Sequence, residues 1–335
     1  MNVPTFARLA LLLVAASLSL FAQDITVPRG LLPIQWPKDN LYSKAKWELG
    51  RTLYYDPRIS ADNSVSCASC HAPKFGFTDG QAVSAGIKHQ LGGRSAPTVI
   101  NRAYSALQFW DGRALTLEEQ AGGPMANPIE MGHTHEGVCQ RLAAIPGYRK
   151  MFEAAFNTDE ITIDRVTKAI ATFERTVLSG NSPYDRYKAG DHKALTATQV
   201  RGMDVFINKA KCDTCHEGIN FTVNAYHNLG IGTDKPDPDP GRFAISKNPK
   251  DWAAFKTPTL REVANTAPYM HDGRFKTLDE VVDFYDKGGI PNKNLDEAMK
   301  PLHLNVQDKK DLVEFLKALS GEGWQHLGPP AKFPE

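Results

Sequence analysis

Four of the five cysteines in this 335-residue chain belong to two copies of one short pattern, C-x-x-C-H. The copies are Cys67-Ala-Ser-Cys70-His71 and Cys212-Asp-Thr-Cys215-His216. This pattern is the attachment signature of c-type haem, in which both thiols bond to the porphyrin edge and the histidine reaches the iron. Zinc sites and redox-active pairs also use C-x-x-C, but neither requires a histidine directly after the second cysteine. The sequence therefore predicts two covalently bound haem c groups, with His71 and His216 as iron ligands.

The residues downstream of each haem motif repeat at a constant separation of 161 residues. Residues 109–113 (FWDGR) lead to TLEE at 116–119, and residues 270–274 (MHDGR) lead to TLDE at 277–280. The haem motifs are only 145 residues apart, so the second copy carries 16 extra residues. The Pro- and Asp-rich stretch 232–241 can hold most of them as a surface loop. Self-similarity over this length indicates two copies of a whole domain rather than a solenoid of short repeats.

The elements that must position these residues are expected to be helices. Thr277 and Glu280 form a capping box before one apolar stripe, and residues 163–177 carry another. Strand patterns with a period of two are scarce. We therefore predict an all-α fold of two cytochrome c-like domains related by internal duplication, at residues 23–185 and 186–335. Each domain is expected to hold one covalent c-type haem.

The repeat also indicates which iron has an open coordination position. A haem iron with two protein ligands transfers electrons, whereas one with a single ligand can bind and activate a small molecule. Tyr285 lies on the apolar face of the capped helix, while its equivalent in the first copy is Pro124, which has no side-chain donor. We expect Tyr285 to complete the second haem and the first haem to stay open. A plain core tyrosine, with Met270 as the other candidate ligand, is the alternative.

An open haem beside a ligated haem suggests peroxide chemistry. Cleavage of the O–O bond needs an acid–base group over the iron, and the candidates near Pro124 are Gln120 and Glu130. Glu130 lies in a turn-like segment, so a surface carboxylate is the competing interpretation. Trp110 occupies the position that the second copy gives to His271. A tryptophan between two haems can relay electrons, and simple core packing is its alternative.

Charge and hydropathy exclude several classes of protein. Lys and Arg number 39 against 38 Asp and Glu, which argues against nucleic-acid binding by phosphate neutralisation. Residues 1–22 have the form of a signal peptide, because Arg8 precedes the 13-residue apolar run 9–21 and Ala22 marks the expected cleavage point. That run is short for a membrane span, although an uncleaved anchor is the alternative. No later run is long enough, so we expect a periplasmic protein without stable membrane insertion.

Together these motifs are similar to those of the bacterial di-haem cytochrome c peroxidases and their relatives of the MauG type. The resemblance covers nearly all of the chain after the expected signal peptide. It rests on both haem motifs and on the segments 49–53 with 56–57, 96–98, 109–113, 268–273 and 281–285.

The resemblance implies roles for the residues singled out above. The family places its electron-relay tryptophan at the position of Trp110. Its peroxide-site glutamate, glutamine and proline match Glu130, Gln120 and Pro124. The distal ligand of the second haem falls at Tyr285, which is a tyrosine in the MauG branch and typically a methionine in the peroxidase branch. The first domain would then hold the peroxidatic haem, and the second domain the electron-transfer haem.

Two family features are altered in this chain. Many of the peroxidases block the first haem with a histidine until the enzyme is reduced; the aligned residue here is Ile87, and His89 is a candidate substitute. The family also binds one calcium ion between its domains, through carbonyls that match Thr266 and Pro268 and an asparagine that is Ser95 here. A hydroxyl is a weaker ligand for a hard cation than an amide oxygen. We therefore expect one Ca²⁺ at a weakened site.

The sequence thus predicts an exported di-haem cytochrome c peroxidase. Electrons from a small donor protein, a cytochrome c or a copper protein, would enter at the second haem, pass Trp110 and reduce hydrogen peroxide to water at the first haem. The alternative is a MauG-like enzyme, in which peroxide makes high-valent iron that oxidises residues of a partner protein, and Tyr285 favours it. A further alternative is an electron carrier without a substrate, which requires two ligands on both irons.

Overall fold

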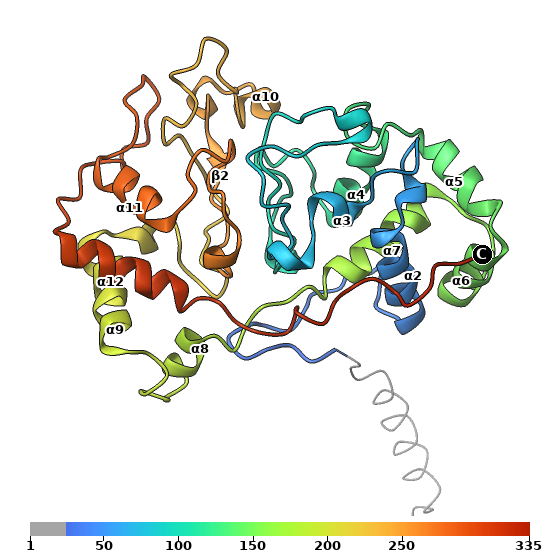
Figure 1. Ribbon diagram of the computed structural model, residues 1–335, viewed down its shortest axis with the longest axis horizontal. Coiled ribbons are helices and arrows are strands. Elements are labelled where there is room, and N and C mark those ends of the chain that lie inside the picture. The colour runs from blue at the N-terminus through green and yellow to red at the C-terminus, as the bar shows by residue number, and fades with distance from the viewer. Residues whose placement is uncertain (1–24) are drawn as a thin grey trace, which may run out of the picture.

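The computed structural model describes residues 25–335, and the predicted signal peptide with its cleavage point near Ala22 lies outside them. The described chain is mainly helical, as predicted, and its helices gather into two lobes (Figure 1). Its strands are one short antiparallel pair, β1 (Tyr226–His227) and β2 (Phe255–Lys256). The α-helices are α2 (Lys44–Tyr55), α3 (Cys67–Cys70), α4 (Leu117–Ala126), α5 (His135–Ala143), α6 (Pro146–Phe156), α7 (Ile163–Glu174), α8 (Pro183–Lys188), α9 (Ala197–Asp204), α10 (Phe243–Ser246), α11 (Leu278–Asp286) and α12 (Val306–Lys317).

The first lobe is built around the crossing of α2 and α7. One apolar core joins these helices to α4, α5 and α6, and Leu53, Phe152 and Phe173 are fully buried in it. Gly50 allows the close crossing, because a Cβ added there would lie 1.8 Å from the carbonyl oxygen of Ala169. Helix α3, which carries the first C-x-x-C-H motif, packs against this core of crossed helices.

The second lobe has the same organisation around α9 and α12. Phe206, Leu312 and Phe315 are buried in a separate apolar core. A glycine again permits the crossing, because a Cβ added at Gly202 would lie 1.9 Å from the carbonyl oxygen of Asp311. Each lobe thus has its own core and its own close-packed helix pair beside its haem motif.

Backbone features recur in the two lobes at the separation seen in the sequence. An isolated bridge joins Gln108 to Ala114 in the first lobe, and another joins Tyr269 to Phe275 in the second. The predicted capping box of Thr277 and Glu280 begins α11. Positive φ angles also recur at equivalent positions, in the pairs Asn101 and Glu262, Phe109 and Met270, and Gly112 and Gly273. Thr116 and Thr277 are the N-caps of the equivalent helices α4 and α11.

The stretch 232–241, predicted as a surface loop, reaches the first lobe. The carboxylate of Asp239 accepts hydrogen bonds at 2.6 and 2.8 Å from Arg94. Arg94 also donates to Asp111 at 2.7 Å. Arg242, just after the loop, donates to the carbonyl oxygen of Asp111 at 2.9 Å. The extra residues of the second copy therefore hold the FWDGR segment of the first.

The C-terminal tail crosses back from α12 to the first lobe, where the chain ends near α6 (Figure 1). Trp324 and Leu327 pack in the first core, and Arg58 donates to the carbonyl oxygen of Pro334 at 3.0 Å. The predicted domain boundary between residues 185 and 186 stays a prediction. By its packing, however, the tail belongs with the first lobe.

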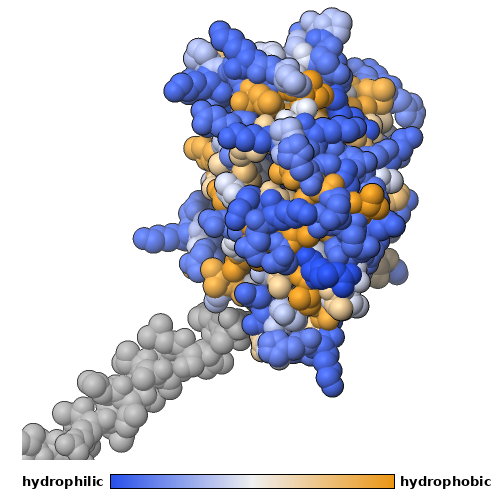
Figure 2. Space-filling model, turned by 90° about the vertical axis from the view of Figure 1, so that its left-hand side faces the viewer, coloured by the Kyte–Doolittle hydropathy of each residue, from blue (hydrophilic) through white to orange (hydrophobic). Residues whose placement is uncertain are grey.

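The surface of the second lobe gives no sign of a membrane-spanning element. Figure 2 views the lobe that holds α9, α11 and α12, and hydrophilic residues dominate this face, with hydrophobic residues in separate patches. Within residues 25–335, no helix combines the length and the apolar character needed to cross a bilayer.

Arg261 and Asp185 form a buried ion pair whose loss should strongly destabilise the protein. Two guanidinium nitrogens donate to the carboxylate at 2.7 and 2.9 Å, and the side chains are only 1% and 3% exposed. Arg261→Met should leave an uncompensated buried charge and lower the free energy of unfolding by about 3–5 kcal/mol. The exposed pair Arg149–Asp159 is the control, and Arg149→Met should cost at most about 1 kcal/mol. Equal losses for the two variants in denaturant titrations would contradict this expectation.

The same pair should make stability depend on pH. Burial alone would raise the pKa of Asp185, but the hydrogen bonds and charge of Arg261 outweigh it and lower the pKa. Because the folded pKa lies below the unfolded value of about 3.9, the stabilisation is present above that pH and is lost as the pH falls through the folded pKa. Acid titration of Arg261→Met should therefore show a shallower loss of stability than the native chain.

Candidate functional site

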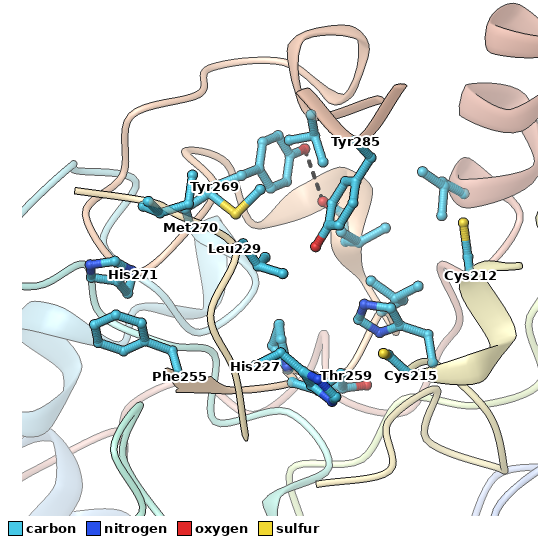
Figure 3. Close-up of a pocket in the computed structure, with 18 of the residues that line it drawn as sticks. Cys212, Cys215, His227, Leu229, Phe255, Thr259, Tyr269, Met270, His271 and Tyr285 are labelled. Carbon is cyan, nitrogen blue, oxygen red and sulfur yellow. Dashed lines mark hydrogen bonds between the residues drawn. The ribbon is translucent and has the colours of Figure 1, made fainter. Parts of the chain in front are cut away.

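The second C-x-x-C-H motif opens onto a cavity of about 250 Å³ in the second lobe (Figure 3). Cys212, Cys215 and His216 line it from the motif, and Tyr285 lines it from α11. Figure 3 shows the Tyr285 ring extending from its helix into this space, with Leu229 and the two cysteines around it. The structure thus brings together the four residues that the sequence assigned to the second haem.

Both motif histidines are held by a backbone carbonyl. Nδ1 of His216 lies 2.9 Å from the carbonyl oxygen of Phe221, and Nδ1 of His71 lies 3.3 Å from that of Phe77. A carbonyl only accepts hydrogen bonds, so Nδ1 carries the proton and Nε2 is left as the metal-binding base. Burial lowers the pKa of both histidines, that of His216 to about 4, which keeps the rings neutral. A c-type haem needs two thiols for the covalent bonds to the porphyrin edge and one such imidazole for the iron, so the residues fit this cofactor.

Tyr285 presents a phenol oxygen that has no hydrogen-bond partner among the described residues. Burial raises the pKa of the Tyr285 hydroxyl, and the neighbouring Cys212 and Cys215 raise it further. The Tyr285 oxygen lines the cavity and is available to a bound cation, which would take the place of the hydroxyl proton. Met270 lines the same cavity from a turn in which its φ is +73°. Both residues that the sequence offered as ligands of the second iron, Tyr285 and Met270, therefore line the second cavity.

The first C-x-x-C-H motif opens onto a larger cavity of about 560 Å³. Cys67, Cys70 and His71 line it together with all the candidates for peroxide chemistry. Helix α4 supplies two of these candidates, the turn after it supplies a third, and the FWDGR segment supplies the last. They are Gln120, Pro124, Glu130 and Trp110.

Glu130 is half-buried and lines this cavity. Asn127 donates to its Oε1 at 2.9 Å, and the backbone carbonyl of Glu130 accepts from the Ile87 N–H at 2.8 Å. Burial raises the pKa of Glu130, although the charge of Arg113 and the Asn127 hydrogen bond oppose the rise. A carboxyl group whose pKa is raised toward neutrality is suited to accept a proton and then return it.

Trp110 lines both cavities and is fixed from two sides. Its indole N–H donates to the carbonyl oxygen of Ser95 at 2.9 Å, and its own carbonyl accepts from the backbone N–H of Lys256 in β2 at 2.8 Å. We call the residues that line both cavities the shared wall. They are Ser95, Ala96, Pro97, Thr98, Arg102 and Trp110.

The two residues considered as blocking groups lie away from the first cavity. Ile87 is buried in the first core, where its Cδ1 approaches Gly132. His89 is exposed to solvent. Of the described histidines, only His71 lines the first cavity. In this structure His89 therefore does not line the first cavity.

The three residues considered for calcium, Ser95, Thr266 and Pro268, all line the second cavity. The carbonyl oxygens of Thr266 and Pro268 accept no hydrogen bond from the described residues. The Ser95 hydroxyl donates to the Gln81 carbonyl oxygen at 3.3 Å. Across residues 25–335, no group of three or more His, Cys, Asp or Glu side chains could hold a metal ion. Two carbonyl oxygens without a hydrogen bond are suitable ligands for a hard cation. The Ser95 hydroxyl, in contrast, already donates a hydrogen bond to Gln81.

Three buried ionisable residues beside the cavities carry no motif that singles them out in the sequence. Glu174 lines the first cavity, Arg102 lies in the shared wall, and Lys256 lines the second cavity. Burial raises the pKa of Glu174 to about 8, and its Oε2 has no partner among the described residues. One sequence feature could have indicated the burial of Glu174: it directly follows Phe173 within an apolar stripe.

Comparison with known proteins gives the class to which this arrangement belongs. A family model for di-haem cytochrome c peroxidases matches residues 44–193. The chain is 41% identical over 287 residues to the methylamine utilization protein MauG of Methylorubrum extorquens, which covers 85% of this chain and 81% of that protein. It is 40% identical over 281 residues to the cytochrome c551 peroxidase of Nitrosomonas europaea, with 82% of this chain and 80% of that protein covered.

A solved structure agrees with these relatives. The crystal structure of a MauG-like protein associated with microbial copper homeostasis matches with a TM-score of 0.84 at 33% identity, covering 91% of this chain and 97% of that chain. The chain therefore belongs to the di-haem cytochrome c peroxidase and MauG family, and the resemblance inferred from the sequence is confirmed. It is a haem oxidoreductase of the cytochrome c peroxidase type, and this family implies two haem c groups.

Tyr285→Phe should change the absorption spectrum of one haem and leave the fold intact. The substitution removes the oxygen that faces the second cavity and keeps the ring volume. Tyr269→Phe is the matched control, because Tyr269 lines the same cavity but donates its hydroxyl to the Val263 carbonyl at 3.0 Å. A native spectrum in Tyr285→Phe would make Met270 the leading candidate ligand.

Proposed function

We propose that this protein reduces hydrogen peroxide to water at the first haem, with electrons that arrive through the second haem from a small cytochrome c or copper protein. The observation that carries the proposal is the first cavity, where Glu130 and Gln120 lie with the haem motif of His71. The raised pKa of Glu130 supports an acid–base role. The relatives include proteins named as cytochrome c peroxidases at 36–40% identity.

The residues of the first cavity divide the work of this reaction. A haem held by the first motif would supply an iron at which peroxide can be reduced. The Glu130 carboxylate would accept a proton from one peroxide oxygen and return it to the other, which leaves as water when the O–O bond breaks. The Gln120 amide can donate a hydrogen bond that orients peroxide, and Pro124 offers no competing side-chain donor. One hydrogen peroxide consumes two electrons and two protons and yields two water molecules.

Trp110 is the proposed electron relay, because it lies in the shared wall and its indole is held by Ser95. Tyr285 is the proposed distal ligand of the second iron, with His216 as the proximal ligand. The free carbonyls of Thr266 and Pro268, with Ser95 beside them in the second cavity, are proposed as the site of one Ca²⁺.

The repeated backbone features support an internal duplication. We propose one haem domain at residues 23–185 and another at 186–335, with the tail after α12 folded back on the first. The bridges Gln108–Ala114 and Tyr269–Phe275 are equivalent under this duplication. Residues 1–22 are proposed to direct export to the periplasm, where peroxide and small donor proteins are available.

A MauG-like oxidation of a partner protein is the second candidate. It is favoured by Tyr285, which lines the second cavity, and by 41% identity to a MauG protein. Steady-state peroxide consumption with a reduced small cytochrome or copper protein separates the two. Sustained consumption of donor electrons supports the peroxidase, whereas peroxide use only with a protein whose own residues become oxidised supports the MauG-like reaction.

Glu130→Gln should slow the reaction with peroxide by about 10²–10⁴-fold, because the amide cannot carry the proton. Since the carboxylate form is needed, the native rate should rise with pH through the raised pKa of Glu130, and the variant should lack this rise. Glu136→Gln, at an exposed position of α5, is the control and should react like the native protein. A native rate in Glu130→Gln, measured by rapid mixing, would make this residue a surface carboxylate.

Trp110→Phe should spare the first encounter with peroxide and impair electron sharing between the haems. Phenylalanine keeps an aromatic filler but is much harder to oxidise, and it loses the hydrogen bond to Ser95. Trp252→Phe, at a residue that lines neither cavity, is the control. Rapid-mixing spectroscopy at both haem bands tests the difference. Normal turnover in Trp110→Phe would require an inter-haem route that avoids this residue.

A further inference from the structure

Two cations are buried at the cavities. Lys256, the second residue of β2, is 3% exposed and lines the second cavity. Arg102 is 8% exposed and lies in the shared wall. Lysine and arginine are almost never buried this deeply unless an opposite charge accompanies them, because the loss of hydration is costly. The surroundings of each cation therefore indicate what it binds.

Lys256 has no counter-charge within the described chain. Its ammonium group makes no hydrogen bond or ion pair with any residue of 25–335. The charged group that acts on it is Arg102, which is itself a cation. Burial and this like charge together lower the pKa of Lys256 well below its usual value. An anion in the second cavity would reverse both effects.

Arg102 is only partly satisfied. Its Nε donates to the Thr98 carbonyl oxygen at 2.8 Å, and Nη1 donates to the Ser105 hydroxyl at 3.3 Å. Nη2 has no partner among the described residues. The carboxyl group that acts on Arg102 is Glu174, but burial raises the pKa of Glu174 to about 8, so it is largely uncharged at neutral pH. The wall therefore carries positive charge that the chain does not neutralise.

The missing anions have a natural source in the cofactor that both motifs fit. A haem carries two propionate carboxylates on the edge of the porphyrin away from the thioether bonds. The thioethers at Cys212 and Cys215 fix one edge of the second haem, so its other edge must lie elsewhere in the same cavity. A guanidinium with a free N–H and a compact ammonium group are the usual protein partners of a carboxylate.

We propose that Lys256 and Arg102 form a carboxylate-binding site at the shared wall, occupied by haem propionates. Lys256 serves the second haem, because it lines the second cavity alone. Arg102 serves either haem, because it lines both cavities. A propionate bound to Arg102 would lie at the shared wall that also holds Trp110, and the positive charges would raise the reduction potential of the neighbouring iron. This inference rests on the proposed binding of one haem at each motif.

Redox titration of the holoprotein tests the site without reference to peroxide turnover. Lys256→Met removes the charge and keeps the length of the side chain. Loss of one buried positive charge should lower the reduction equilibrium constant of the second haem about tenfold, or about 59 mV, and leave the first haem unchanged. Arg102→Leu should lower both potentials. Lys256→Arg should restore the native value, and Lys317→Met, at an exposed position of α12, should change neither.

Each other outcome overturns the inference. Unchanged potentials in folded Lys256→Met, or equal shifts in Lys256→Met and Lys317→Met, would show that no propionate depends on Lys256. The reduction potential of the second haem could instead vary with chloride concentration in the native protein and lose this dependence in Lys256→Met. That result would show that Lys256 binds a free anion rather than a propionate. Two haem waves without the expected shifts would overturn this site alone. A chain that shows fewer than two haem waves in the native protein would overturn the proposed function itself.

Discussion

Trp110 makes hydrogen bonds to both lobes and lines both cavities. Its indole N–H is held by Ser95 in the first lobe, and its carbonyl is held by the N–H of Lys256 in the second. One residue is thereby tied to both lobes, by its side chain to Ser95 and by its backbone to Lys256. The shared wall around it belongs to the lining of both cavities, so the two cavities are separated by a single layer of residues there.

The two lobes repeat one backbone and differ in the side chains that this backbone presents. In the first lobe, α4 offers Pro124 to the cavity, and the turn after α4 adds Glu130. In the second lobe, α11 offers Tyr285. Both motif histidines keep the same hydrogen bond to a carbonyl, so the proximal side is constant. The two cavities therefore differ in the side chains that α4, the turn after it and α11 present, while the hydrogen bond of the motif histidine is the same in both.

The connections between the lobes go beyond the repeat. Asp239, from the stretch that the second copy adds, is paired with Arg94 of the first lobe, and Arg94 in turn holds Asp111 beside Trp110. The C-terminal tail adds Trp324 to the first core. These contacts join the two lobes both at the segment that holds Trp110 and along the C-terminal tail.

Features that depend on short spacings along the chain could be predicted before the fold was known. The C-x-x-C-H motifs specify covalent chemistry within five residues, the capping box of Thr277 and Glu280 specifies where α11 begins, and the constant offset aligned Tyr285 with Pro124. Which residues line both cavities could not be predicted in this way, because it depends on packing between segments more than 100 residues apart, as for Trp110 and Lys256. It also placed His89 in solvent, and it buried Lys256, Arg102 and Glu174. Burial of a charge is a property of the surrounding packing, and for Lys256 and Arg102 no local pattern in the chain records it.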